Sequence, residues 1–437
     1  MGTPELILAH TDERDLAQLD EYRAIGGYRS LARARELEPA ALIQAITDAT
    51  LRGRGGAGFP MGRKASLIDQ KNPRKYVVVN ADESEPGAFK DREIMGRNPH
   101  LLIEGCLITA RAIEAHAVFI YIRGEYLTEY EILDRAVEDA RAADLFGDVD
   151  VVVHRGAGAY ICGEESALLE SLEGKRGQPR PRPPFPPVTG LYAKPTQINN
   201  VQTIATVPKI LELGVEEFAK IGVPSSPGTA VFSLSGNVAR PGNYELPLGT
   251  PLRSLIYDVG GGIPDGRAIK GIIPGGSSVP ILTPDQLDTP LDYDSIQAAG
   301  SFFGSAAVIV VDDRCCMVQL ALRAAKFYMH ESCGKCTPCR EGTRWLVQLL
   351  TRIEEGDAVD ADLELLESVC SRMLGRSLCA LGDFAVYPVS SYLRKFRGEF
   401  QQHVDEGACP YGAESSIAGI EAPIDAHMHH PTVEVPG

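Results

Sequence analysis

The sequence has no apolar run long enough to cross a membrane and no excess of positive charge. The apolar run Ala306–Val311 has the length of a strand, whereas a membrane helix needs about 20 residues. A net charge of −16 argues against nucleic acid as a partner, because phosphate would be repelled. The start of the chain, Met1–Leu6, carries neither a basic, apolar export signal nor an Arg-rich transit pattern. These absences predict a protein of a cytoplasmic compartment whose thiols stay reduced.

Length and composition leave the function open. At 437 residues the chain is too long for one ordinary hydrophobic core, and we expect roughly two to four domains. An apolar fraction of 44% and a charged fraction of 23% are ordinary for a globular protein. The motifs therefore have to identify the chemistry.

The segment His330–Arg340 holds three cysteines in C-x2-C-x2-C spacing, Cys333, Cys336 and Cys339. A short loop of this kind presents three thiolates to one iron–sulfur cube, and Cys379 is the best candidate for the fourth ligand. Zinc is the alternative, since C-x2-C also opens many zinc sites. Those sites usually close with a second C-x2-C or an H-x3-5-H pair, and neither follows here. Three free thiols remain the plainest alternative.

The other cysteines and the tail histidines are expected to have no role in the chemistry. Most of these cysteines lie in helix-like stretches and are interpreted as packing residues: Cys106, Cys162, Cys315, Cys316 and Cys370. The rest are expected to be exposed, and any metal binding there would be weak and unimportant: Cys409, His427, His429 and His430.

The segment Leu51–Pro60 is rich in glycine and is flanked by Arg52, Arg54, Arg63 and Lys64. Glycines let backbone N–H groups approach a ligand, and the basic side chains favour an anion such as phosphate. The spacing also fits G-x-G-x-x-G, but a dinucleotide fingerprint should follow a strand, and a helical stripe precedes this one. We interpret the segment as a phosphate cradle of another kind, with a flexible loop as the alternative.

Strands and helices alternate after this loop, which predicts a mostly parallel sheet covered on both faces. The expected strands are Tyr76–Val79, Val118–Ile122 and Val149–Val153. The expected helices are His100–Ala115, a helix to about Ala143 that opens at a Thr128–Glu131 capping box, Cys162–Leu172, and a stripe within Thr196–Leu213 interrupted by Pro208.

Acidic clusters follow two of the expected strands, at Asn80–Gly87 and Gly163–Glu165. Ligands of such sheets lie beyond the carboxyl ends of the strands, so these clusters favour a polar ligand that carries hydroxyls. Paired carboxylates could also indicate glycoside hydrolysis, but an aromatic-rich sugar platform is absent from this half of the chain.

After the predicted parallel sheet, the pattern of predicted secondary structure changes. A proline-rich stretch, residues 175–190, is either a linker or a stiff wall that carries Phe185. Short strands are expected at Val231–Ser235, Pro241–Glu245 and Ala268–Ile273, with a helix at Pro251–Val259. The last unit is expected to be helical, at Asp312–Met329, Thr343–Ile353, Asp362–Met373 and Ser390–His403.

Four motifs taken together resemble one family: Gly53–Pro60, Asn80–Gly87, Gly156–Glu165 and Glu331–Arg340. The chain is similar to the NADH-binding flavoprotein subunit of respiratory complex I, the family of NADH-quinone oxidoreductase F subunits. The resemblance implies an α/β Rossmann-like FMN domain, a small β-grasp (ubiquitin-like) domain, and a C-terminal helical bundle that carries a [4Fe–4S] cluster. The implied boundaries are 1–38 (extension), 39–227 (FMN and NADH), 228–311 (β-grasp), 312–410 (cluster bundle) and 411–437 (tail).

The resemblance also implies the site residues. FMN would be held by Gly53, Arg54, Gly55, Gly56, Gly58, Lys64, Asn80, Asp82, Ser84, Gly163, Asn199, Asn200 and Thr203. NADH would be positioned by Phe59, Glu85, Tyr160, Glu164, Glu165 and Phe185, and Glu83 also belongs to the cofactor-binding set. The cluster would be held by Cys333, Cys336, Cys339 and Cys379. Two positions depart from the family, which often has Lys where Arg182 stands and an aromatic residue where Leu67 stands.

The implied activity is oxidation of NADH by hydride transfer to FMN, followed by single-electron transfer through the [4Fe–4S] cluster toward quinone. No protein nucleophile or general base is needed, because the flavin supplies that chemistry. The implied partners are a small thioredoxin-like [2Fe–2S] subunit and a large multi-cluster subunit of the peripheral arm of this proton-pumping translocase. The chain would lie on the cytoplasmic side of the inner membrane and touch the membrane only through the complex. The alternatives are a diaphorase subunit of a soluble NAD-reducing hydrogenase or formate dehydrogenase, and a scaffold protein with structural zinc.

Overall fold

A computed structural model describes residues 5–418 of the chain, which fall into two compact units. The first unit comprises the chain up to Gly266 together with Gly271–Val310. The second comprises Arg267–Lys270 and the chain from Val311 onward. His427, His429 and His430 lie outside the described residues.

The first unit contains a four-stranded parallel sheet in the order β3-β2-β1-β4. Its strands are β1 (Tyr76–Ala81), β2 (Ala117–Ile122), β3 (Asp150–Arg155) and β4 (Thr196–Asn200). The three predicted strands are present and parallel, as the alternation of strand and helix indicated. The fourth strand, β4, was not predicted, because the helical stripe that follows it masked its five residues.

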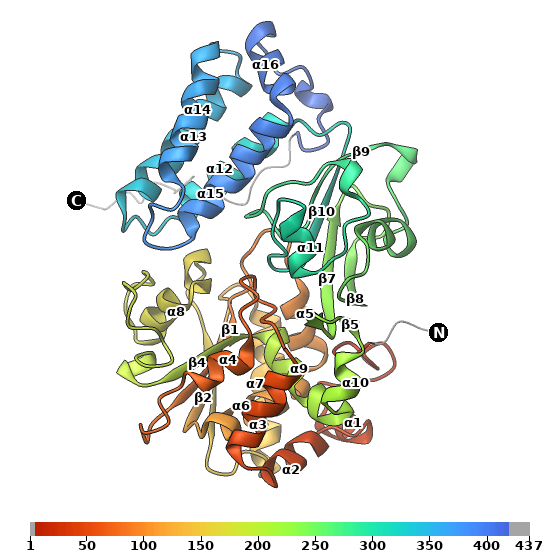
Figure 1. Ribbon diagram of the computed structural model, residues 1–437, viewed down its shortest axis with the longest axis vertical. Helices are drawn as coiled ribbons and strands as arrows, with labels where there is room; N and C mark the ends of the chain where they lie inside the picture. The colour runs from red at the N-terminus through yellow and green to blue at the C-terminus, as the bar shows by residue number, and fades with distance from the viewer. Residues whose placement is uncertain (1–4, 419–437) are drawn as a thin grey trace, which may run out of the picture. The chain divides into compact units, whose positions relative to one another are not determined.

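One face of this sheet forms the main hydrophobic core. Alternate strand residues such as Val77, Val79 and Ile120 are fully buried there against α6 and α9, which lie side by side (Figure 1). Residues of the opposite register point to the other face, where the Tyr121 hydroxyl lies 2.9 Å from the Ser171 hydroxyl of α8. The helices of this region are α4 (Met61–Ser66), α5 (Lys90–Arg97), α6 (Pro99–Ile113), α7 (Leu127–Ala142), α8 (Glu165–Leu172) and α9 (Val201–Leu213).

Two helix starts differ from the prediction. Helix α7 begins at Leu127 without a side-chain cap, so the capping box predicted at Thr128 is not formed. Helix α8 begins at Glu165 rather than at Cys162, because Tyr160–Gly163 forms a 3₁₀ turn. The Glu164 carboxylate then caps α8 by accepting the backbone N–H groups of Ser166 and Ala167.

The N-terminal segment, whose role the sequence did not reveal, is anchored by two buried carboxylates. Glu245 accepts backbone N–H groups from Leu6, Ile7 and Leu8, the shortest at 2.8 Å. Glu104 of α6 accepts the Tyr28 and Leu31 N–H groups at 2.9 and 2.8 Å. The helices that follow are α1 (Leu19–Ala24), α2 (Arg29–Arg35) and α3 (Pro39–Asp48).

A second sheet in the order β8-β7-β10-β9 follows along the chain. Strand β7 pairs antiparallel with β8 and parallel with β10. The predicted short strands are confirmed, while the helix predicted at Pro251–Val259 is a π-helical turn at Ser254–Val259. The elements are α10 (Val215–Ala219), β5 (Gly222–Val223), β6 (Ser226–Pro227), β7 (Thr229–Gly236), β8 (Gly242–Pro247), β9 (Ile269–Ile273), α11 (Tyr293–Ala298) and β10 (Ala307–Asp312).

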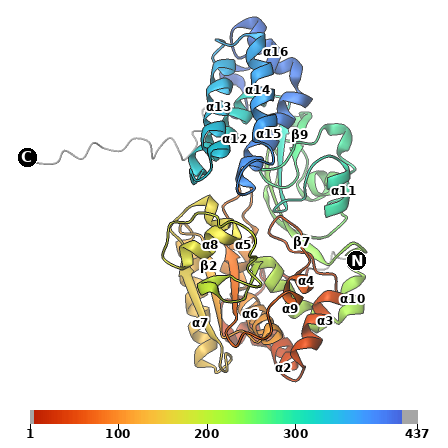
Figure 2. The same ribbon diagram turned by 60° about the vertical axis from the view of Figure 1, so that its left-hand side comes forward.

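Helices make up most of the second unit, and Figures 1 and 2 both show α12 to α16 gathered into one group, coloured from turquoise to blue. They are α12 (Met317–Glu331), α13 (Thr337–Glu354), α14 (Asp360–Met373), α15 (Leu381–Lys395) and α16 (Arg397–Glu406). The predicted helix Ser390–His403 is two helices, because Phe396 leaves the helical conformation. Within residues 5–418, none of the helices is both long and apolar enough to span a membrane.

Candidate functional site

The predicted polar residues of the first unit collect at the carboxyl edge of the parallel sheet. β1 leads to β2 and β3 on one side, while β4 lies on its other side, so the connections diverge between β1 and β4. Ligands of open α/β sheets bind at such a switch point. Asn80 and Asn200 are register partners at the ends of these two strands. The topology therefore places two amides side by side where a ligand would enter.

The glycine-rich loop packs closely against the start of α9. A Cβ atom at Gly55 would come within 2.7 Å of the Asn200 Cβ, a distance that a real side chain does not tolerate. Gly58 has φ +63°, and a Cβ there would meet the Tyr293 ring at 2.6 Å. Only glycine fits both positions without a shift of neighbouring groups. The loop thus lies beside a helix N-terminus, where backbone N–H groups attract anions.

Arg54 is the most unusual side chain of this loop, because its guanidinium is only 1% exposed. Its backbone N–H donates to the Thr203 hydroxyl at 2.8 Å, and its Nη2 donates to the Pro227 carbonyl at 2.8 Å. The Nε and Nη1 atoms have no hydrogen-bond partner within the described part of the chain. Burial lowers the pKa of this guanidinium, and the neighbouring Tyr293 side chain opposes the fall. Arginine nevertheless stays charged in proteins. A buried cation with two unused donors fits a phosphate group.

A small ion-pair network closes one side of this edge. The Lys64 ammonium, on α4, lies 3.3 Å from Glu165 and donates to the Ile198 carbonyl at 3.0 Å. Arg182 pairs with Glu165 at 3.0 Å and also with Glu164. Arg182 therefore has a structural role, since its guanidinium pairs with both carboxylates at the start of α8.

Glu85 links this edge to the loop that follows β9. Its carboxylate accepts the Tyr160 hydroxyl at 2.8 Å and the Ser278 backbone N–H at 2.7 Å. Burial raises the pKa of the Glu85 carboxyl, although these hydrogen bonds oppose the rise. Tyr160 and Glu85, predicted from separate motifs, are thus brought into direct contact.

The remaining predicted residues take three kinds of position. Some bond to neighbours at the strand ends: the Asn80 amide donates to the Gly163 carbonyl at 2.8 Å, and the Ser84 hydroxyl donates to the Asp82 carboxylate at 2.8 Å. Asn199 is buried, and it accepts from Gln197 at 3.0 Å. Phe59 and Phe185 are exposed by 41% and 54%. Exposed rings beside a polar edge are available to stack on a planar ligand.

Glu83 serves the protein itself. Its carboxylate accepts the N–H groups of Asp91 and Arg92 at 2.9 and 3.1 Å, at the start of α5, and the Tyr126 hydroxyl at 3.2 Å. Burial, reinforced by the nearby Asp91 carboxylate and opposed by Lys90, raises the pKa of Glu83 to about 7. Its contacts are those of a helix cap.

Glu83→Gln is expected to change how stability depends on pH. Because the folded pKa of about 7 lies above the ordinary value of 4.5, the favourable contribution of Glu83 is complete below the lower value and is lost as pH rises to the upper one. The amide does not ionise, so the variant should be less stable than the native chain at pH 5. Between pH 5 and pH 8 its free energy of unfolding should rise by about 2–3 kcal/mol relative to that of the native chain. Thermal unfolding between pH 5 and 8 measures this difference. The exposed Glu131→Gln serves as the control, and a gap for Glu83→Gln that does not vary with pH would contradict the prediction.

The cysteine loop of the second unit joins α12 to α13, as predicted. Cys336 occupies the N-cap of α13 and Cys339 lies in its first turn, where the helix dipole stabilises thiolates. The Ser332 hydroxyl lies 3.2 Å from the Cys339 sulfur. Burial raises the pKa of Cys339 to about 11, and the neighbouring Cys336 and Cys333 add to the rise. Cys379 lies between α14 and α15.

Several residues of the site carried no signal in the sequence. Tyr293 donates its hydroxyl to the Gly53 carbonyl, and Ser278 holds Glu85. Lys90 and Asp91 form a buried ion pair at 2.6 Å, and Asp91 accepts from Asn200. Lys90 and Asp91 belong to the charged run Lys90–Glu93, where nothing in the sequence marks them as buried. The contacts of Tyr293 and Ser278 join residues 240 and 193 positions apart, so they depend on the tertiary fold.

Three family models match the chain. The model described as "Nuo51 FMN-binding domain" matches residues 46–209. The model described as "NADH-ubiquinone oxidoreductase-F iron-sulfur binding region" matches residues 319–403. An SLBB domain matches residues 231–282. The matched regions contain the glycine loop, the cysteine loop, strands β8 and β9 and most of β7.

A solved structure and curated relatives extend these matches over nearly the whole chain. The crystal structure of an NAD+-reducing [NiFe]-hydrogenase in the H2-reduced state superposes with a TM-score of 0.81 at 36% identity, over 93% of this chain and 68% of that one. The NADH-quinone oxidoreductase F subunit 2 of Rhizobium meliloti is 49% identical over 93% of this chain and 99% of the relative. The F subunit of Mycobacterium tuberculosis strain H37Rv is 50% identical over 92% of this chain and 93% of the relative. This chain belongs to the family of NADH-quinone oxidoreductase F subunits.

Proposed function

We propose that this chain is the NADH-oxidising flavoprotein subunit of an NADH-quinone oxidoreductase, with FMN and a [4Fe–4S] cluster as its cofactors. The observation that carries the proposal is the buried Arg54, whose two unused donors lie in a glycine loop at the N-terminus of α9. Bound there, FMN would supply the chemistry that accepts two electrons from NADH and passes them on one at a time.

The FMN phosphate would be held by Arg54 and by the backbone of the glycine loop. Lys64 and the amides at the switch point would bind polar atoms of the flavin and its ribityl chain, because they lie at the same edge of the sheet. The set proposed to contact FMN is Gly53, Arg54, Gly55, Gly56, Gly58, Lys64, Asn80, Asp82, Ser84, Gly163, Asn199, Asn200 and Thr203. The rest of the predicted cofactor set belongs to NADH, except Glu83, which would support the site by capping α5.

NADH would lie over the same edge, between exposed aromatic rings and carboxylates. Phe59 and Phe185 offer faces for the adenine, and Glu165 offers oxygens to the ribose hydroxyls. Glu85 and Tyr160, joined by a hydrogen bond, would hold the nicotinamide end in place, with Glu164 bracing α8. These groups position the substrate, and none acts as a nucleophile or a base.

The cluster would be held by Cys333, Cys336, Cys339 and Cys379. Each sulfur of a cube binds a different iron, so its ligands need not converge on one point, as the ligands of zinc must. Among residues 5–418, no three of these four cysteines have their sulfurs gathered tightly enough for a single ion. The C-x2-C-x2-C pattern, with Cys379 as a fourth thiolate, supports a cube in this loop.

The arrangement of domains and partners is also a proposal. The sheet β8-β7-β10-β9 would be the β-grasp domain, and α12 to α16 the cluster-bearing bundle, within the boundaries 39–227, 228–311 and 312–410. The partners would be a thioredoxin-like [2Fe–2S] subunit and a large multi-cluster subunit. The chain would sit on the cytoplasmic side of the membrane and reach the membrane through that complex.

A diaphorase subunit of a soluble hydrogenase is the second candidate, because the superposed hydrogenase shares this fold. The curated relatives, named as F subunits of NADH-quinone oxidoreductase and matched over almost their full lengths, favour the respiratory complex. Copurification of the tagged chain from its native cell distinguishes the two: quinone-reductase subunits would support the proposal, and hydrogenase subunits would overturn it.

Analysis of anaerobically purified protein tests the cofactors directly. We expect one FMN with about four iron and four sulfide per chain, and rapid reduction of ferricyanide by NADH. Colourless protein that takes up neither flavin nor iron and sulfide on reconstitution would contradict the proposal.

Glu165→Gln is expected to relax the preference for NADH over NADPH. Its carboxylate is partly exposed beside Lys64 and Arg182, so its charge would repel the extra phosphate of NADPH while its oxygens accept ribose hydroxyls. We expect the NADPH-to-NADH ratio of kcat/KM to rise about tenfold or more. Glu170→Gln is the matched control, because Glu170 also lies on α8 and pairs with an arginine. The parallel variant Glu85→Gln should mainly raise KM for both nucleotides, and an unchanged ratio in Glu165→Gln would refute the assignment.

A further inference from the structure

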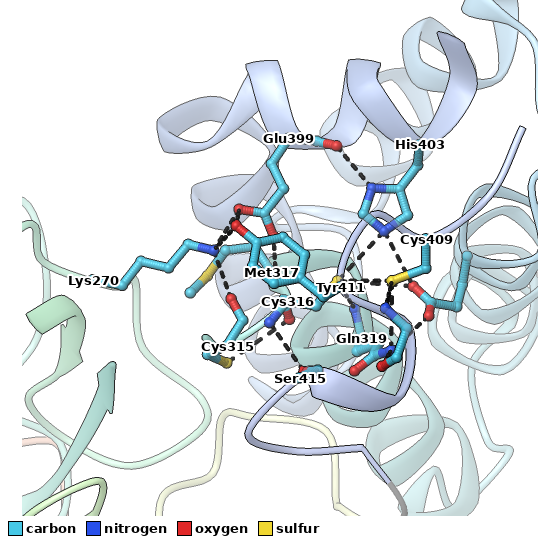
Figure 3. A network of polar contacts seen from close by, with 12 residues as sticks. Lys270, Cys315, Cys316, Met317, Gln319, Glu399, His403, Cys409, Tyr411 and Ser415 are labelled. Atoms are coloured by element: carbon cyan, nitrogen blue, oxygen red, sulfur yellow. Dashed lines mark hydrogen bonds and ion pairs between the residues drawn. The ribbon is translucent and has the colours of Figure 1, made fainter. Parts of the chain in front are cut away.

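Four potential metal ligands meet in the second unit, away from the cysteine loop. They are Cys316, Glu354, His403 and Cys409, and their ligand atoms all lie within 4.8 Å of one another (Figure 3). No other group of three or more such residues converges in this way within residues 5–418. The sequence alone had favoured a packing role for Cys316 and an exposed position for Cys409. The structure instead brings both to the same point.

The separations between these atoms are those of a tetrahedral zinc site. With Zn–S of about 2.3 Å and Zn–N or Zn–O of about 2.0–2.1 Å, tetrahedral ligands lie about 3.8 Å (S–S), 3.6 Å (S–N), 3.5 Å (S–O) and 3.3 Å (N–O) apart. The two sulfurs are 3.7 Å apart, and the Cys316 sulfur is 3.4 Å from His403 Nε2 and 3.8 Å from Glu354 Oε2. His403 Nε2 is 3.4 Å from Glu354 Oε2. Four edges of one tetrahedron are therefore already present.

The groups around the four ligands prepare them for a cation. His403 Nδ1 lies 2.8 Å from the Glu399 carbonyl, which fixes the tautomer that leaves Nε2 to bind a metal. Gln319 donates its side-chain amide to the second oxygen of Glu354 at 2.7 Å. Backbone N–H groups of Gln319 and Gly412 point at the two sulfurs, each at 3.4 Å. Such contacts orient ligands in metal sites.

A disulfide explains this arrangement less well than a metal does. A sulfur–sulfur bond is about 2.0 Å long, so the two sulfurs, 3.7 Å apart, are not bonded to each other. A disulfide would also not explain why the buried His403 and the Glu354 carboxylate lie beside the two sulfurs. Two thiolates with an imidazole are soft and borderline ligands that suit zinc better than magnesium or calcium.

We propose that Cys316, Glu354, His403 and Cys409 form a structural Zn²⁺ site, distinct from the iron–sulfur loop. Four protein ligands leave no open position, which is the mark of a structural rather than a catalytic site. Two thiolates and one carboxylate bring three negative charges to a dication, so the filled site keeps a net charge of −1.

The ion would join four separate segments of the second unit. Cys316 caps α12, Glu354 ends α13, His403 lies on α16, and Cys409 lies in the segment after α16. That last segment is otherwise attached mainly by polar contacts: Ser415 accepts the Cys316 N–H at 3.2 Å, and Lys270 donates to the Tyr411 hydroxyl at 2.9 Å. Zinc would fasten residues 407–416 onto the helices that carry the cysteine loop.

Metal analysis of the intact holoprotein tests the site. The chain is purified anaerobically with its cofactors, dialysed against ZnSO4 and then freed of loose metal. We expect about one zinc per chain in the native protein and in Cys370→Ser, which changes a buried cysteine outside the site. Cys409→Ser and His403→Asn should each retain less than about a fifth of that zinc. Their iron content and cluster EPR spectrum should not change, which separates this site from the cysteine loop.

Cobalt provides a test that does not depend on any variant. Native chain loaded with CoCl2 should show the thiolate-to-cobalt absorption and intense visible bands of a tetrahedral site, and added zinc should abolish both. Three results would overturn the proposal: native protein that takes up neither metal, Cys409→Ser that keeps its zinc, or a Cys316–Cys409 disulfide in anaerobically prepared protein.

Discussion

Cys339→Ala is expected to remove the iron–sulfur cluster and, with it, electron transfer to quinone. The Cys339 side chain is 5% exposed and lies at the N-terminus of an 18-residue helix, where its thiolate would be favoured and no other sulfur can replace it. Iron and sulfide per chain should fall nearly to zero, and quinone reduction in native membranes should fall about 100-fold or more. NADH–ferricyanide activity should persist within about threefold, because the flavin site lies in the other unit.

The control for this prediction is Cys370→Ser, which removes a buried thiol of the neighbouring α14. It should keep both its iron and its quinone activity. If Cys339→Ala retained a native cluster EPR spectrum, Cys339 would not be a ligand. If ferricyanide activity were lost together with the iron, the proposal that FMN and the cluster are held by residues of different units would be wrong.

Arg54→Met is expected to abolish tight binding of FMN without weakening the flavin-free fold. The methionine keeps much of the side-chain volume but removes a buried guanidinium that has two unused donors. Hydrogen bonds to charged groups contribute about 1.5–3 kcal/mol each, so the loss of two, about 3–6 kcal/mol, predicts an affinity weaker by roughly 100-fold to 10,000-fold. The flavin-free variant should unfold at the same temperature as the flavin-free native chain or higher, because an uncompensated buried charge has been removed.

Quenching of flavin fluorescence in a titration of the flavin-free chain measures this affinity. Arg63→Met is the matched control, since Arg63 flanks the same loop but its side chain is exposed. The two measurements distinguish a binding role from a structural one. Unchanged FMN affinity would remove Arg54 from the phosphate site, whereas a large loss of stability in the flavin-free form would show that Arg54 mainly supports the fold.

The sequence predicted the local motifs well, because their spacing is set by the backbone over a few residues. The C-x2-C-x2-C loop lies between two helices as predicted, and the glycine loop precedes the parallel sheet. Three of the four strands of that sheet were expected. The errors lie at short elements: β4 was hidden by the stripe of α9, and Glu164 displaced the expected start of α8. Such boundaries depend on caps and pairing as much as on periodicity.

The site residues divide in the same way. Glycine at positions 55 and 58 could be identified from the motif, but its necessity rests on contacts with Asn200 and Tyr293. Glu83 shared a motif with Glu85, yet the fold turned it toward the start of α5. Neighbours in a strand-end loop point in different directions, and only the packing of other segments decides which of them faces a ligand.

By itself, the sequence determined the family and the two cofactors, because short motifs with fixed spacing identify both. The tertiary structure alone decided which side chains lack partners and which distant ones meet. The unused donors of Arg54 and the convergence of Cys316 with Cys409, 93 residues apart, are of this second kind. Such contacts form only when separate helices and strands pack together, so the spacing of residues along the chain does not predict them.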